Sequence, residues 1–278
     1  MPLKNIHDED IIPIFEDILP SRKGLHIMLK VFLDRGEKVA KDKTDDVVCV
    51  AAIVFKPVHY KQFIRPWNRM LRGWGASAFH ATDFYSGYGE FKRDTPEKEE
   101  RFQSDSRFIP SLIGKHLYRL EMISFRPSEF ARTASQRWKD RFGTELHGIA
   151  VQLCMVSLGW WLNDHHASEQ FAYIRESGDR GEGDVDDAIR GVRNDPEYSR
   201  VVRVHSYRRV AKGAARGTEA ADFAAWHWNK HYIDRARLGE DTPRKDFAAF
   251  GNAAEEKVSS AFITGDKLKE FLRVCDQP

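Results

Sequence analysis

The chain has 278 residues, of which 41% are hydrophobic and 31% are charged. This composition is typical of a globular protein with one substantial core and excludes a disordered chain. The net charge is +2 with histidine counted as neutral, so bulk charge does not argue for a nucleic-acid partner. The 3 cysteines are far apart and form no C-x-x-C pair, which favours reduced thiols and excludes a disulfide framework or a cysteine-based zinc site.

We expect a cytoplasmic protein with no membrane partner. The first residues are polar and acidic, without the basic segment and apolar run of a secretory signal. The most apolar stretch, residues 148–162, is shorter than the ~18 residues that usually span a bilayer. Gln152 and Ser157 also interrupt it. We interpret this stretch as a buried core helix.

The N-terminal half of the chain predicts two strands and a helical insertion. Aliphatic residues over 27–33 predict a first strand, which ends at Asp34. The apolar run 47–55 predicts a second strand that is buried on both faces. Apolar residues at helical spacing predict a helix over 57–74, and another helix is predicted to begin at Thr95, a favourable N-cap residue.

The rest of the chain alternates between strands and helices. Strands are expected over 117–125, 171–174 and 201–205, and helices over 185–192 and 218–232, in addition to the long apolar helix. This alternation predicts an α/β fold: a mixed five-stranded sheet flanked by helices, with the helical insertion between strands two and three.

Three acidic residues occupy positions that are typical of a divalent-metal site. Asp34 ends the first predicted strand, Glu176 follows the fourth, and Asp222 lies among small apolar residues of the last helix. Strand ends and neighbouring helices converge in an open α/β sheet, and Mg²⁺ prefers oxygen ligands. The pattern predicts Mg²⁺ or Mn²⁺ at these acids, with Glu219 on roughly the same helix face as Asp222. In the alternative, Asp34 is a turn residue, Glu176 is a solvated loop acid, and Asp222 is a capping or ion-paired aspartate.

A second candidate group lies in the segment Phe79-His80-Ala81-Thr82-Asp83-Phe84, which precedes a glycine-rich loop. We expect this segment in the insertion, which would fold over the sheet edge and bring His80 to the acids as a proton donor. In the alternative, His80 and Asp83 bond each other and fix the local loop.

A basic cluster directly precedes the Asp222 helix, and it contains Arg208, Arg209, Lys212 and Arg216. Such a cluster is suited to follow a phosphate backbone beside the acidic site, which would make nucleic acid the partner. The alternative is a solvated loop.

Five of these segments, in this order, resemble the domain of unknown function 3800 family over about residues 27–232. They are the first strand ending at Asp34, the hydrophobic second strand, the segment Phe79–Phe84, the segment Glu176-Ser177-Gly178-Asp179, and the helix segment Glu219-Ala220-Ala221-Asp222-Phe223-Ala224-Ala225-Trp226. That family is regarded as RNase H-like. The resemblance implies a central five-stranded mixed sheet with Asp34, Glu176 and Asp222 as catalytic metal-site acids, and it places His80 and Asp83 in a family hallmark. It also suggests Glu145, at the start of the long helix, as a fourth acid.

The resemblance implies an RNase H-like domain over 27–232, an N-terminal extension over 1–26 and a C-terminal helical appendage over 233–278. It favours a metal-dependent nuclease or a related phosphoryl-transfer enzyme. One departure favours an alternative. The family usually shows Asp-Glu-Ser-Gly after the first strand, whereas this chain has Asp34-Arg35-Gly36-Glu37-Lys38. The alternative is therefore a non-catalytic module that binds nucleic acid or protein and has a degenerate site.

Overall fold

The computed structural model describes the central part of the chain. The described residues are 28–38, 47–136, 139, 145–165, 168–178, 182–238, 257–263 and 269. The expected N-terminal extension, residues 1–26, lies outside them. None of the helices within these ranges combines the length and the apolar composition that crossing a bilayer requires.

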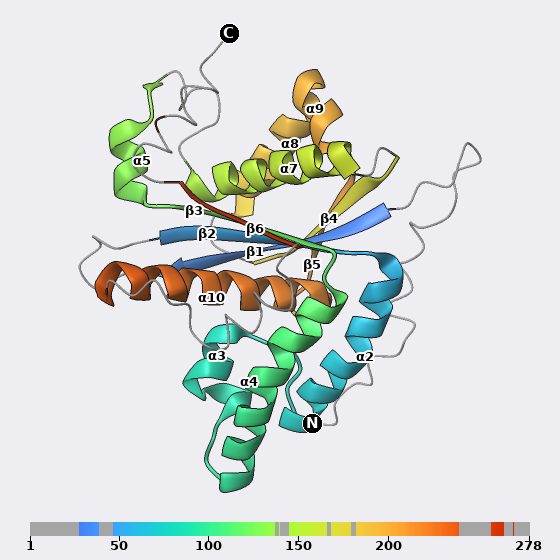
Figure 1. Cartoon of the computed structure of the whole chain (residues 1–278), viewed down its shortest axis with the longest axis vertical. Coiled ribbons are helices and arrows are strands. Elements are labelled where there is room, and N and C mark those ends of the chain that lie inside the picture. Colours follow the sequence, from blue (N-terminus) through green and yellow to red (C-terminus); the bar gives the residue numbers. More distant parts are fainter. Residues whose placement is uncertain are drawn as a thin grey trace.

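A six-stranded mixed sheet forms the centre of the described structure (Figure 1). Its strands are β1 (Met28–Lys38), β2 (Val47–Phe55), β3 (Arg119–Phe125), β4 (Gln170–Glu176), β5 (Val204–Val210) and β6 (Val258–Ile263). They lie in the order β5-β4-β1-β2-β3-β6, and only β2 is antiparallel to its neighbours. β2 is buried along its whole length, as its continuous apolar run predicts.

Helices cover both faces of this sheet (Figure 1). α10 (Arg216–Leu238) lies along one face, and α7 (Leu146–His165) lies along the other. α7 packs on β2 and β3 with one side and on α8 (Glu182–Asn194) and α9 (Pro196–Val202) with another. Because α7 is enclosed in this way, its sequence is apolar around the helix, and the prediction of a buried core helix is confirmed.

The insertion between β2 and β3 lies on the α10 side of the sheet (Figure 1). It contains α2 (Pro57–Trp74), α3 (Ala81–Ser86), the 3-10 helix η2 (Gly89–Phe91) and α4 (Pro96–His116), and the short α5 (Pro127–Thr133) follows β3. Thr95 caps α4 as predicted, because its Oγ1 accepts the backbone N–H of Lys98 at 3.4 Å. The rings of Phe79, Phe84 and Phe91 contact one another. This aromatic cluster fixes the chain on either side of His80.

Several predicted strand boundaries are wrong. β3 begins at Arg119 rather than at residue 117, β4 covers Gln170–Glu176 rather than 171–174, and β5 extends to Val210 rather than to residue 205. β1 does not end at Asp34 but continues to Lys38, because its last residues pair with β2, from Arg35 opposite Val50 to Lys38 opposite Val47. The fifth strand begins at Val204 rather than at residue 201, because α9 extends through Val202.

The sheet also has one strand more than the five predicted. β6 pairs in parallel with β3, from Val258 opposite Leu120 to Ile263 opposite Phe125. It lies within residues 233–278, where we expected short helices. Its sequence is short and only partly apolar, which is why an edge strand of this kind gives a weak sequence signal.

Candidate functional site

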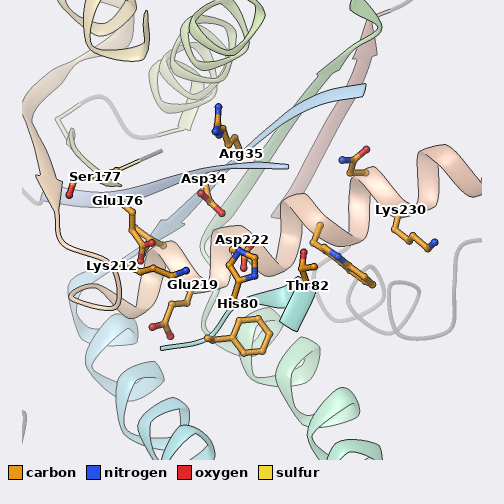
Figure 2. A pocket seen from close by; sticks show the side chains of 15 residues that line it. Asp34, Arg35, His80, Thr82, Glu176, Ser177, Lys212, Glu219, Asp222 and Lys230 are labelled. Carbon is orange, nitrogen blue, oxygen red and sulfur yellow. The ribbon is translucent and has the colours of Figure 1, made fainter. Parts of the chain in front are cut away.

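Four acidic residues line one open pocket with a volume of about 650 Å³: Asp34, Glu176, Glu219 and Asp222 (Figure 2). β1 and β4 are parallel neighbours and their last paired residues are Leu33 and Arg175, so Asp34 and Glu176 come next on adjacent strands. α10 crosses this face of the sheet and contributes Asp222. The three predicted acids Asp34, Glu176 and Asp222 thus line the same pocket, although Asp34 lies inside a strand rather than at its end.

Glu176 is held at the end of β4 by the loop that leads into α10. Its Oε1 accepts the backbone N–H of Gly213 at 3.1 Å and the hydroxyl of Thr218 at 2.9 Å. Gly213 has a φ of +75°, a left-handed conformation that favours glycine and allows its N–H to face the carboxylate. Glu176 is therefore an oriented carboxylate rather than a solvated loop acid.

Asp222 is half-buried, and its Oδ2 accepts the backbone N–H of Ala81, the first residue of α3, at 2.7 Å. Burial raises the pKa of this carboxyl, and the nearby Glu176 carboxylate raises it further. His80, the Ala81 N–H and Lys212 act in the opposite direction and lower it. The net effect is a raised pKa, with burial as its main cause.

His80 enters the pocket from the insertion, while Asp83 stays outside the pocket lining. Figure 2 shows the His80 ring beside Asp222. The Nδ1 atom of His80 is buried, has no hydrogen-bond partner among the described residues, and lies 3.7 Å from Oδ2 of Asp83. The position of His80 agrees with the predicted approach to the acids. Asp83 lies at ion-pair distance from His80 without a hydrogen bond between them.

Glu219 and two residues of the basic cluster, Arg209 and Arg216, pair with other side chains of the protein. The Glu219 carboxylate accepts hydrogen bonds from the Trp67 indole and from Arg216, with which it forms a buried ion pair. Burial raises the pKa of Glu219 to about 7, although the positive charge of Arg216 lowers it. Nη1 of Arg209 lies 3.4 Å from Oδ2 of Asp186. Of the four basic residues, only Lys212 lines the pocket.

Arg35 and Glu145 are directed away from the centre of the site. Arg35 follows Asp34 in an extended strand, so the two side chains point to opposite faces of the sheet, as Figure 2 shows. Arg35 still contributes to the lining of the pocket. Glu145 immediately precedes α7 on the other face of the sheet and is exposed. Glu145 does not line this pocket as a fourth acid.

Several lining residues were not predicted. Trp226, Asn229 and Lys230 extend the pocket along α10, and Thr82 belongs to α3. The first three follow Asp222 by four, seven and eight positions, which is the spacing of one helix face. That spacing was the signal in the sequence that could have identified them.

A complete metal site is not preassembled in the part of the chain that the structure describes. No group of three or more histidine, cysteine, aspartate or glutamate side chains there is close enough to hold one ion. Comparisons with protein families, with curated proteins and with solved structures found no match for this chain.

Proposed function

We propose that the protein is a divalent-metal-dependent nuclease, or a related phosphoryl-transfer enzyme that acts on nucleic acid, with an RNase H-like fold. The observation that carries the proposal is the convergence of Asp34, Glu176 and Asp222 at one pocket from β1, β4 and α10. The contiguous strands β3-β2-β1-β4-β5 support the fold, because the resemblance implies a central mixed sheet of five strands. β6 would be an addition at the β3 edge.

The residues that would hold Mg²⁺ or Mn²⁺ are Asp34, Glu176 and Asp222. Glu176 and Asp222 fit this role because each has one carboxylate oxygen bonded to the protein, while the other accepts no hydrogen bond from the described residues. The proximity of Asp222 to the Glu176 carboxylate also favours a cation. When bound, the ion supplies Lewis-acid stabilisation of the negative charge on a phosphate. Since no three acids are yet close enough to hold it, these side chains must move together on binding.

Two further residues would act on the substrate directly. Lys212 is exposed at the pocket beside Asp222 and would attract a phosphate group. His80, next to Asp222, would donate a proton from its ring to the leaving oxygen.

One observation favours the non-catalytic binding module instead. Asp222 already has a structural role, since it accepts the N–H of Ala81 and so joins α3 to α10. A chain that has lost metal binding would still keep Asp222 for this contact. Nucleic-acid binding without cleavage is therefore the second candidate function.

Metal-induced stabilisation and cleavage together test the proposal. Mn²⁺ should raise the Tm of the wild type, because it binds the folded state. Asp222→Asn and Glu176→Gln should remove most of this gain. Glu100→Gln, which neutralises an exposed acid on α4 outside the pocket, should keep it. The same proteins are then incubated with labelled DNA and RNA strands. Equal metal-induced shifts in all four proteins would contradict the metal site, and metal binding without cleavage would support the second candidate.

A further inference from the structure

The pocket continues along α10 beyond the acids. Trp226, Asn229 and Lys230 line this part and share a helix face with Asp222. With a rise of ~1.5 Å per residue, Trp226 lies about 6 Å along the helix axis from Asp222. In Figure 2, Lys230 and Lys212 lie on opposite sides of His80. The pocket therefore has an acidic end and a second end formed by an indole, an amide and an ammonium group.

The indole of Trp226 is held in one orientation by its neighbours. It stacks on Tyr85, with ring centroids 4.4 Å apart and an angle of 8° between the rings. The Tyr85 hydroxyl in turn lies 2.8 Å from Nε2 of His227, a fully buried histidine, and shares a hydrogen bond with it. Trp226 itself is only half-buried and lines the pocket. A fixed, partly exposed ring of this kind is a stacking surface for a planar ligand.

Asn229 adds an unsatisfied polar group to the same end of the pocket. Its side chain is only 5% exposed, and its Oδ1 is buried with no hydrogen-bond partner among the described residues. An unpaired buried amide is costly, so its presence in a pocket points to a ligand that completes its hydrogen bonds. The edges of nucleobases carry N–H donors and acceptors that an asparagine amide can match.

We propose that Trp226, Asn229 and Lys230 form a base subsite that binds one unpaired nucleobase, stacked on Trp226 and hydrogen-bonded to Asn229. This inference rests on the proposed function and deepens it, because it names single-stranded nucleic acid as the substrate. A base inside a duplex is covered by its neighbours and does not reach Trp226 unless it leaves the stack. The phosphates that flank the bound base lie toward Lys212 and Lys230. The base subsite requires no metal ion.

Binding in EDTA tests the base subsite separately from cleavage. The fluorescence anisotropy of labelled oligonucleotides is measured with a single strand, the same strand in a duplex, and an abasic strand with the same phosphates. The wild type should bind the single strand at least about tenfold more tightly than the other two probes. Trp226→Leu should weaken single-strand binding by a similar factor and leave abasic binding unchanged. Trp160→Leu, which removes a 61% exposed indole from α7 on the other side of the sheet, should bind like the wild type.

The abasic probe and a second variant keep the test independent of the stability of Trp226→Leu. Wild-type protein that binds intact and abasic strands equally overturns the proposal, as does failure to bind any strand. Asn229→Leu should also weaken single-strand binding, and unchanged affinity in this folded variant counts against the subsite. Base-dependent binding in EDTA without cleavage in Mg²⁺ supports the base subsite and contradicts the proposed nuclease activity. Cleavage without base-dependent binding overturns the base subsite alone.

Discussion

Oδ2 of Asp222 accepts the backbone N–H of Ala81 at 2.7 Å across a sequence separation of 141 residues. This hydrogen bond is one of several that join the insertion to α10, and it does so beside His80. Asp222 is therefore both an acid of the candidate metal site and an anchor for the segment that carries His80.

Substitutions at Asp222 should separate these two roles. Asp222→Ala leaves the N–H of the fully buried Ala81 without an acceptor, and we expect a loss of roughly 1–3 kcal/mol in the free energy of unfolding. Asp222→Asn keeps an acceptor oxygen and should be much less destabilising. Urea unfolding of both variants measures the difference. Equal stability of the two variants would show that the hydrogen bond to Ala81 contributes little.

The stability of the protein should depend on pH through Glu219. Burial raises the pKa of Glu219 from 4.5 to about 7, so the folded state binds this proton more tightly than the unfolded state does. The resulting stabilisation is fully present below pH 4.5 and is lost as the pH rises through 7, with an upper limit on the order of 3 kcal/mol. Glu219→Gln cannot ionise, so its Tm should change less with pH over this window than that of the wild type. Glu100→Gln serves as the control and should retain the wild-type profile.

The close approach of α10 to β1 requires glycine at position 217. A Cβ added to Gly217 would lie 2.3 Å from ring atoms of Phe32, which is itself enclosed by Phe55 and Tyr60. Gly217→Ala should cost about 1–3 kcal/mol and should also reduce the Mn²⁺-induced rise in Tm, because it moves Asp222 away from the sheet. Gly191→Ala is the matched control. It lies in α8 with no atom within 4 Å of the added Cβ, and it should stabilise the protein by roughly 0.5–1 kcal/mol.

In the absence of a ligand, Asn229 should lower the free energy of unfolding of the protein. Replacement by leucine, which has a similar shape, removes a buried amide oxygen without a partner, and we expect the free energy of unfolding to rise by roughly 1 kcal/mol. Asn68→Leu should have the opposite effect, because Oδ1 of Asn68 accepts the Nε–H of Arg216 at 2.7 Å. Thermal unfolding of both variants provides the comparison. A destabilised Asn229→Leu protein would indicate that this amide has a structural partner.

The sequence predicted those elements whose signals are local. The bounds of β2 and α2 match the prediction at both ends, because a continuous apolar run marks the strand and Pro57 marks the first turn of the helix. The end of β1 was missed because polar residues after Asp34 continue the strand through their pairing with β2. The position of β5 was predicted wrongly because this edge strand is largely polar, and its residues therefore show no apolar periodicity. The domain boundaries and the RNase H-like fold stay predictions.

The acids of the site were predictable because Asp34 and Glu176 follow apolar strand segments and Asp222 lies in a helix rich in small residues. Their partners were not, since each comes from a distant part of the chain. Glu176 is held by Gly213 and Thr218, and Glu219 is occupied by Trp67, which is 152 positions away. The sequence therefore identified the carboxylates but could not distinguish the role of Glu219 from that of Asp222. Both line the pocket, and only the folded structure shows that Glu219 is committed to a buried ion pair with Arg216.

The placement of β6 has a consequence for how the chain is synthesised. β3 offers its backbone N–H and C=O groups to β6 along Leu120–Phe125, and β6 comes from the last part of the described chain. Until Val258–Ile263 have left the ribosome, the nascent domain presents β3 as an open edge, which is a template for pairing with strands of other molecules. We therefore expect the nascent chain to require chaperones during translation. Products that stop before Val258 should aggregate, because they lack this six-residue strand.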